Sequence, residues 1–309
     1  MGVRSTNPTQ SFFDDFFRSG TDAVSAAPSL VSGPISATGG DSTLTISGYK
    51  VHIFTTTGAS TFVVSSGGGE VEYLVVAGGG SGSAQYGGGG GAGGLRTNLS
   101  GHPLAGDPVN VQPGTTNVTV GAGGAYVTPP GMPGVAGANS SIDPNSPETN
   151  TITATGGGGG GHPGEQPSPW YPTPGTNGGP GGSGGGGAGR TGTYAPNYTG
   201  GAGNAGGFPT PTREGYPGGV GTFPGNRCGG GGGGAGAAGS DAGGDAGPGG
   251  VGVQCLIAGN PSPIGTPGPS GDGWFAGGGG GGGYNVTAGS GGAGGDGGSG
   301  IVVIRYPTS

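Results

Sequence analysis

The sequence predicts a mainly β protein organised around a polyglycine II helix lattice, with a short antiparallel sheet or sandwich and a short N-terminal helix. Of the 309 residues, 92 are glycine, and nearly all of them lie between Gly78 and Gly300. Segments of strand-forming residues stand directly before and after this body, at 73–76 and 301–306. Because a disordered linker would not need such a bracket, we expect an ordered body that leaves one sheet and returns to it.

The glycine-rich body can fold only if backbone packs directly on backbone. Ordering glycine costs more backbone entropy than ordering other residues, and glycine has no side chain to bury. Disorder is therefore the alternative that composition alone leaves open. Collagen is disfavoured because the unbroken runs at 156–161, 229–234 and 277–283 keep no third-residue period. Such runs favour a lattice of extended helices that are bare on every face and pair their N–H and C=O groups with neighbours.

The chain divides into four parts by composition. We expect an N-terminal docking arm at 1–40, a β-strand region at 41–77, the glycine-rich body with its display loops at 78–300, and a closing strand of the β region at 301–309. In the arm, Pro8 and Gly20 suit the start and the end of a short helix. One face of this helix would carry four phenylalanines, Phe12, Phe13, Phe16 and Phe17. Either this face folds back onto the body, or it anchors the chain to a partner or to other copies of itself, which we favour.

Short strands are expected in the β region and at intervals beyond it. From Asp41 onward, β-branched and aromatic residues alternate with polar ones between glycine turns, a pattern typical of an antiparallel sheet or sandwich. The pattern predicts four strands, with a turn at 67–69 between the last two, at 44–46, 49–54, 61–65 and 71–76. Further strands are expected at 109–111, 117–120, 151–154 and 301–306.

Charge and cysteine content restrict the function classes. The formal net charge is −7, and the eight basic residues are scattered, so a nucleic-acid surface is disfavoured. No apolar run reaches the length of a membrane helix, and no secretion signal of the usual kind opens the chain. Cys228 and Cys255 could close one disulfide bridge or remain two free thiols. The three histidines are dispersed, so no metal site is expected.

Three motifs in order resemble a glycine-rich domain that is common in bacteriophage tail-fibre and virion structural proteins. Residues 70–80 (EVEYLVVAGGG) look like its opening, 112–124 (QPGTTNVTVGAGG) like its middle motif, and 300–306 (GIVVIRY) like its closing strand. Residues 3–10 are similar to the start of cyanophage virion proteins. Such domains also occur in cellular surface proteins.

The resemblance implies a recognition role for the loops between glycine runs. In similar tail-tip adhesins, polyglycine helices stack in a sandwich and variable loops touch the host receptor. The loops here combine stiffening prolines with aromatic side chains, which suit stacking on sugars or gripping a protein. The alternative is that the aromatics cover the lattice ends as small local cores. The implied receptor contacts are Trp170, Tyr171, Tyr194, Tyr198, Phe208, Tyr216, Phe223, Trp274 and Phe275.

No catalytic pattern is evident, and no cofactor is expected. The single lysine, Lys50, excludes a P-loop, and no nucleophile, base and acid stand together in a recognisable spacing. We therefore expect a non-enzymatic phage virion protein, a tail-fibre or fibre-tip component located in the virion or otherwise outside cells. Its expected partners are other virion proteins or further copies of itself, and a host-surface glycan or protein. The rivals are a self-assembling fibre or capsid-decoration protein without a receptor, and a cellular or extracellular glycine-rich matrix protein.

Overall fold

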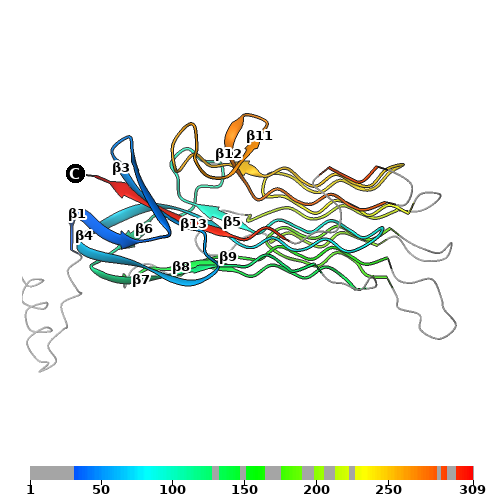
Figure 1. Cartoon of the computed structure of the whole chain (residues 1–309), viewed down its shortest axis with the longest axis horizontal. Helices are drawn as coiled ribbons and strands as arrows, with labels where there is room; N and C mark the ends of the chain where they lie inside the picture. Colours follow the sequence, from blue (N-terminus) through cyan, green and yellow to red (C-terminus); the bar gives the residue numbers. More distant parts are fainter. Residues whose placement is uncertain are drawn as a thin grey trace, which may run out of the picture.

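A computed structural model describes most of the chain beyond the N-terminal arm. The described residues are 31–126, 132–146, 151–163, 175–189, 198–204, 213–222, 227–283, 287–290 and 297–308. The helix expected around Phe12 and Phe17 therefore lies outside the described residues. The molecule is elongated, with the strands gathered toward one end and the glycine segments running along the long axis toward the other (Figure 1).

The described residues form β-strands and no helix. The strands are β1 (Gly33–Gly39), β2 (Ser42–Ile46), β3 (Tyr49–Phe54), β4 (Gly58–Val76), β5 (Leu95–Thr97), β6 (Val109–Val111), β7 (Gly114–Val120), β8 (Ser140–Asp143), β9 (Ile152–Ala154), β10 (Val253–Gln254), β11 (Thr266–Gly268), β12 (Gly271–Phe275) and β13 (Ile301–Pro307). Ten of them form one antiparallel sheet with the order β2-β3-β13-β4-β7-β8-β9, in which β1, β5 and β6 also pair with β4. A second sheet has the order β10-β12-β11.

The bracket around the glycine body closes as the sequence predicts. Strand β13 lies between β3 and β4, and Ile301 pairs with Val76 while Ile304 pairs with Tyr73. The chain therefore leaves the sheet at the end of β4 and returns beside its own point of departure. The other strands expected from the pattern are confirmed, with ends that differ by a few residues.

Strand β4 corrects the expected turn at 67–69. The chain does not reverse there, because β4 runs through all three glycines as one strand of 19 residues. Gly67 and Gly69 have φ values of +71° and +143°, which side-chain-bearing residues rarely adopt. Before this point β4 pairs with β1 and β7, and after it with β6, β13 and β5. The glycine triplet thus lets one strand bend between two sets of partners.

Two apolar cores lie against the sheet. The first contains Phe54, Phe62, Tyr73 and Tyr306 together with valines and isoleucines of β4, β6 to β9 and β13. The second contains Val51, Leu74, Ile257 and Phe275 and covers part of the sheet with the segment around β10 to β12. Fully buried aromatic and branched side chains are thus concentrated at the sheet end of the molecule, where most of the hydrophobic stabilisation arises.

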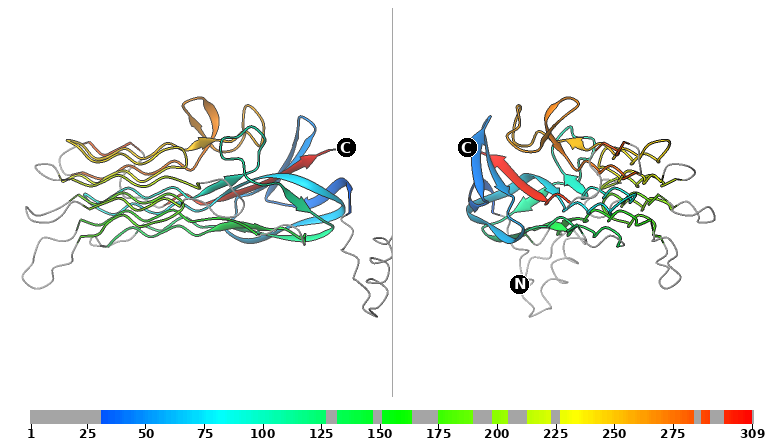
Figure 2. Two further views of the ribbon diagram at one scale, coloured as in Figure 1. Left: turned by 180° about the vertical axis from the view of Figure 1, so that it is seen from behind. Right: turned by 45° about the vertical axis from the view of Figure 1, so that its right-hand side comes forward.

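The glycine segments form a hydrogen-bonded layer in which the partner changes with a period of three. Along 229–235, Gly229, Gly232 and Ala235 donate to the segment 276–282, at 2.7–2.9 Å. Gly230 and Gly233 donate to the segment 184–187, and the two remaining glycines donate to 237–240. Each N–H therefore points to one of three neighbouring segments in rotation, and these segments run side by side in both views of Figure 2. A three-residue turn is the period of extended helices without internal hydrogen bonds.

The layer leaves no room for side chains at its interior positions. A Cβ atom built on any glycine of 229–234 would come closer than 3.0 Å to a backbone carbonyl oxygen of another segment. At Gly232 the nearest atom is the carbonyl oxygen of Gly90, and at Gly231 it is that of Pro248. These contacts place the glycine Cα–H groups on carbonyl oxygens, a weak hydrogen bond that recurs where backbones pack closely.

Side chains occur on the layer where a segment faces outward. In the outer segment 132–139, Met132 and Val135 are 54% and 42% exposed. Gly134 and Gly137 in the same segment face inward. A Cβ on Gly134 would overlap the carbonyl oxygen of Ser81, and a Cβ on Gly137 would overlap that of Gly78. The same three-residue period thus separates an inner glycine face from an outer face that carries side chains.

Five strands were not predicted inside the glycine body, and one was not predicted before it. Strand β1 belongs to the stretch expected to be arm, while β5, β8, β10, β11 and β12 have two to five residues each. The five strands inside the body are too short to show an alternating pattern. Strands β11 and β12 also contain glycine or proline, which are rare in strands.

His52 provides a pH test of the packed sheet. Its Nδ1–H donates to the carbonyl oxygen of Gly39 at 2.7 Å, and its Nε2 accepts from the hydroxyl of Tyr306 at 3.2 Å. Burial lowers the pKa of His52 below its usual 6.5, although the bond to Gly39 opposes this and Lys50 adds to it. Folding therefore favours the neutral ring. Because the unfolded chain binds the proton more readily, the contribution of neutral His52 to stability is fully present above the pKa of the unfolded chain's histidine. That contribution is lost as pH falls below this pKa.

Between about pH 7 and pH 5, we expect the unfolding free energy of the His52→Gln variant to fall less than that of the native chain. Urea denaturation at several pH values measures this. Part of the pH dependence should remain, because burial also lowers the pKa of His102. An identical slope for variant and native chain would contradict the assignment to His52.

Candidate recognition surface

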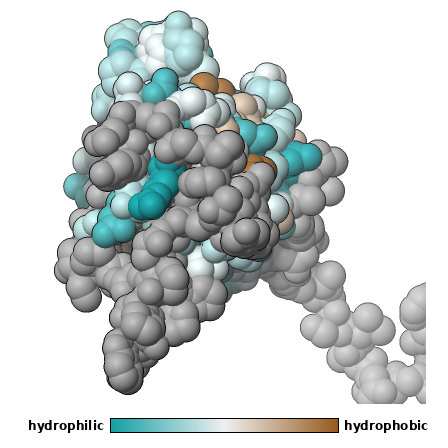
Figure 3. Space-filling view, turned by 90° about the vertical axis from the view of Figure 1, so that its right-hand side faces the viewer, coloured by the Kyte–Doolittle hydropathy of each residue, from teal (hydrophilic) through white to brown (hydrophobic). Residues whose placement is uncertain are grey.

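The glycine layer has a distal end, opposite the sheet, where several chain segments are fastened to one another. Gly189 donates to the carbonyl oxygen of Tyr86 at 2.9 Å, and Gly221 donates to that of Tyr198 at 2.9 Å. Thr176 donates to the carbonyl oxygen of His162 at 2.7 Å. We use "distal end" for the surface around these contacts, which Figure 3 views directly. The described surface visible there is mainly hydrophilic or neutral, with small apolar areas.

Three of the expected recognition stretches leave and rejoin the described chain at this distal end. They are 164–174, 190–197 and 223–226, and they carry Trp170, Tyr171, Tyr194 and Phe223. These four residues lie outside the described residues. Tyr198 is described, and it is half-buried with its ring against Gly175. The anchors of these stretches are thus part of the hydrogen-bonded layer.

The remaining predicted contacts are anchored elsewhere. Phe208 lies outside the described residues, but the chain on either side of it, at Asn204 and Arg213, is at the junction between layer and sheet. Tyr216 is half-buried there beneath the guanidinium of Arg213, whose carbon lies 4.4 Å from the ring centre. The aromatics that the sequence grouped as one set therefore divide between separate parts of the molecule.

Tyr86 and Arg227 are distal residues that the sequence analysis missed. The guanidinium carbon of Arg227 lies 5.5 Å from the ring centre of Tyr86, a distance at which cation and ring attract each other. Tyr86 ends the polar interruption 81–86 within the first glycine run. Like the longer loops, this interruption places an aromatic residue between glycine runs, but it lacks the prolines that distinguish those loops in the sequence.

A buried ion pair fastens the junction between layer and sheet. The Nε–H of Arg96 donates to Oε1 of Glu214 at 2.5 Å, and the side chains are 3% and 0% exposed. Asn204 donates from Nδ2 to Oε2 of Glu214 at 2.5 Å and to the hydroxyl of Thr155 at 3.0 Å. Leu95 in β5 donates its N–H to the Glu214 carbonyl oxygen at 3.1 Å. Arg96 and Asn204 thus meet at one carboxylate, and Leu95 and Thr155 are joined to the same network.

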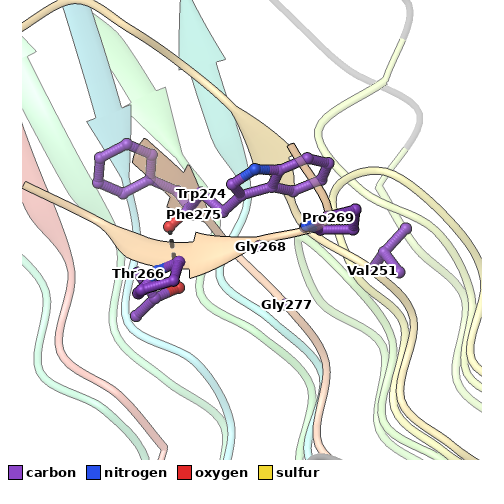
Figure 4. A pocket seen from close by; sticks show the side chains of 9 residues that line it. Val251, Thr266, Gly268, Pro269, Trp274, Phe275 and Gly277 are labelled. Atoms are coloured by element: carbon purple, nitrogen blue, oxygen red, sulfur yellow. Dashed lines mark hydrogen bonds between the residues drawn. The ribbon is translucent and has the colours of Figure 1, made fainter. Parts of the chain in front are cut away.

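A pocket of about 190 Å³ lies on the side of the molecule, beside the sheet β10-β12-β11. Figure 4 shows the indole of Trp274 extending toward Pro269 and Val251, whereas the ring of Phe275 points the opposite way. Phe275 is 8% exposed and belongs to the second core, whereas a receptor contact was predicted for it. Trp274 is half-buried and lines the pocket.

The sequence of the region 55–307 matches the family model of a glycine-rich domain. The chain belongs to this family. The match begins just before β4 and ends with β13, so it spans the glycine body together with the two strands that bracket it. No curated protein matches the chain. The β1–β3 strands precede the match, although β3 pairs with β13 as an integral part of the same sheet.

The two cysteines of the glycine-rich domain are free thiols. Cys255 lies in the second core, whereas Cys228 lies in a small cluster with Ala242 and Ala246. Of the two possibilities that the sequence left open, the structure therefore has no bridge. Burial raises the pKa of Cys255 to about 11, and burial together with Asp245 raises the pKa of Cys228.

We expect a reducing agent to leave the melting temperature of the folded chain unchanged, because no disulfide constrains it. Alkylation with iodoacetamide, followed by mass spectrometry, should label both thiols only after denaturation, since the thiolate is the reactive form. Rapid labelling of either cysteine in the folded chain would contradict this expectation.

Within the part of the chain that the structure describes, no group of three or more His, Cys, Asp or Glu side chains could hold a metal ion. No helix long and apolar enough to span a membrane occurs among those residues.

Proposed function

We propose that this glycine-rich domain protein is a non-enzymatic virion component of a bacteriophage, in a tail fibre or at a fibre tip, that displays loops for recognition of a host surface. The observation that carries the proposal is the fastening of three aromatic-bearing stretches to one end of a hydrogen-bonded layer. Loops held at their bases by a rigid framework lose less conformational freedom on binding than loops on a flexible chain. Binding residues are also commonly found on loops that a scaffold positions.

We further infer that the layer consists of polyglycine II helices. The support is the period of three, which appears in the donors of 229–235, in the inward positions of glycine and in the exposed positions of the outer segment 132–139. Because N–H groups point to neighbours on three sides, each helix is held from several directions. Such a layer resists bending more than a chain with free backbone groups does.

The position of the chain's first described residues suits attachment at the opposite end. The N–H of Val31 donates to the side-chain oxygen of Gln112 at 2.6 Å. The side-chain nitrogen of Gln112 donates in turn to the carbonyl oxygen of Val31 at 3.3 Å. Strand β1 follows, and both β1 and the C-terminus lie at the sheet end (Figure 1). Residues 1–30 therefore join the described chain far from the distal end. We propose that Phe12, Phe13, Phe16 and Phe17 attach the protein there to another virion protein or to a further copy.

Loop exchange tests the proposed display function. Replacing 164–174 by a Gly-Ser stretch of equal length should abolish adsorption of assembled particles to host cells, because Trp170 and Tyr171 are removed while their anchors remain. The same exchange at 205–212, which is anchored at the junction, serves as the matched control and should preserve adsorption. Both variants should melt near the native temperature. The exchange of 164–174 can be combined with the same exchange at 190–197 and at 223–226. Unchanged adsorption of particles that carry all three exchanges would refute display at the distal end.

A second candidate function, a self-assembling fibre subunit, is favoured by one observation. The outer segment 132–139 presents exposed Met132, Val135 and Ala138, and its described neighbour 121–126 presents exposed Ala122 and Ala125. These two segments carry no charged residue. Repulsion between the net negative charges of two copies should therefore be weakest when the copies meet at this face. Sedimentation of Val135→Asp tests this candidate, with Val251→Asp as a control on another face. Oligomers lost only in Val135→Asp would support a fibre; a monomeric native chain would exclude assembly of the isolated protein.

A further inference from the structure

We propose that the pocket beside Trp274 binds one ring of a neutral sugar. This inference deepens the proposed recognition function and rests on it for its biological meaning. The pocket lies at the side of the molecule, near the sheet β10-β12-β11, and not among the anchors of the distal stretches. The molecule would therefore contact a glycan at a second place.

The size and lining of the pocket limit what can occupy it. Its volume of about 190 Å³ is smaller than the roughly 300–1,000 Å³ of pockets that hold drug-sized ligands, so it suits a single ring. No charged side chain is among the lining residues, which are Val251, Gly252, Thr266, Pro267, Gly268, Pro269, Trp274, Phe275 and Gly277. An anionic ligand such as a phosphate or an acidic sugar would find no counter-charge in this lining.

Trp274 supplies an aromatic platform that is held in place. A Cβ on Gly268 would overlap the indole, so the backbone of this glycine lies directly against it. The hydroxyl of Thr266 donates to the Trp274 carbonyl oxygen at 3.2 Å, which ties β11 to β12 (Figure 4). Val251, 51% exposed, forms an apolar rim. A rigid aromatic contact needs little ordering when a ligand binds.

Polar groups for a ligand are present at the same place. Among the described residues, the backbone N–H and C=O groups of Gly252 and Gly277 form no hydrogen bond, and Gly277 is exposed. The indole Nε1–H is buried and also finds no acceptor among those residues. Unsatisfied buried donors are few in folded proteins, and each calls for an explanation such as a ligand or a water molecule. A sugar ring combines an apolar C–H face for the indole with hydroxyl groups for the free backbone groups.

Tryptophan fluorescence tests the proposal directly, because the chain has only two tryptophans. In the Trp170→Phe variant Trp274 is the sole reporter, and it can be titrated with methyl glycosides of glucose, galactose, mannose and N-acetylglucosamine. We expect a saturable change for at least one of them, with a dissociation constant in the millimolar range. Sialic acid serves as the anionic control and should give none. A proline-rich peptide is the competing occupant, and saturation by it in place of every sugar would overturn the proposal.

Variants at the pocket separate binding from folding. Val251→Asp alters only the rim and should weaken sugar binding by about tenfold or more while leaving the melting temperature unchanged. Trp274→Ala, followed by saturation-transfer NMR, should show no sugar signal. If no neutral sugar gives a saturable change in Trp170→Phe, or if Val251→Asp binds as the parent does, the site is refuted. The experiment uses purified protein, so it can fail while loop exchange still abolishes adsorption, and it can succeed while loop exchange has no effect.

Discussion

Replacing Gly232 by alanine is expected to destabilise the fold by on the order of 3 kcal/mol or more, because the added methyl group has no space. Its Cβ would overlap the carbonyl group of Gly90 and would also come too close to the backbone nitrogen of Gly91. Backbone atoms cannot rotate away as the end of a flexible side chain can. The two segments would have to separate, and the hydrogen bond from Gly232 to Gly279, 2.7 Å long, would be strained or lost.

The matched control for this substitution is Gly244→Ala. A Cβ at Gly244 meets no atom within 4 Å, and the residue is exposed and has no left-handed backbone. Its effect should lie within about 0.5 kcal/mol of zero, or be slightly stabilising because alanine restricts the unfolded chain. Urea denaturation of both variants measures the difference. Equal stabilities would show that the layer is looser than its hydrogen bonds indicate, and the rigid display argument would then fail.

The arrangement of the glycine body was predictable in outline because glycine restricts the possibilities so strongly. Runs without side chains can be ordered only by backbone pairing, and the strands 73–76 and 301–306 indicated where the body begins and ends. The partners of each run were not predictable, since identical glycines carry no information about which segment lies beside which. That information resides in side chains at the junctions, such as Arg96 and Glu214, whose pairing spans 118 residues.

Residue type was enough to propose candidate recognition residues, but it did not give their positions. Tyrosine and tryptophan between glycine runs indicated display loops, and Tyr198 lies among the distal anchors. The sequence pattern could not show that Phe275 turns into a core while the neighbouring Trp274 lines a pocket, because both are bulky aromatics beside a glycine run. The alternation of strand β12 separates them, and β12 was too short and too rich in glycine to be recognised as a strand.

Glu214→Gln is the second substitution expected to have a large effect. It keeps the size of the side chain and removes the carboxylate charge that pairs with the buried guanidinium of Arg96 at 2.5 Å. Removing one partner of a buried ion pair typically costs about 3–5 kcal/mol, whereas replacing both partners by apolar residues can be nearly neutral. We therefore expect Glu214→Gln to be severely destabilised in urea denaturation, and the double variant Arg96→Met with Glu214→Met to recover much of the loss.

The double variant decides between two roles for this ion pair. If stability returns and the amide hydrogen of Leu95 still exchanges slowly, apolar packing can replace the charges both in energy and in holding β5 against the segment of Glu214. If stability returns while Leu95 exchanges quickly, the carboxylate network is needed to hold β5 against the segment that carries Glu214. A mild effect of Glu214→Gln alone would contradict the expectation that this buried ion pair depends on the carboxylate charge.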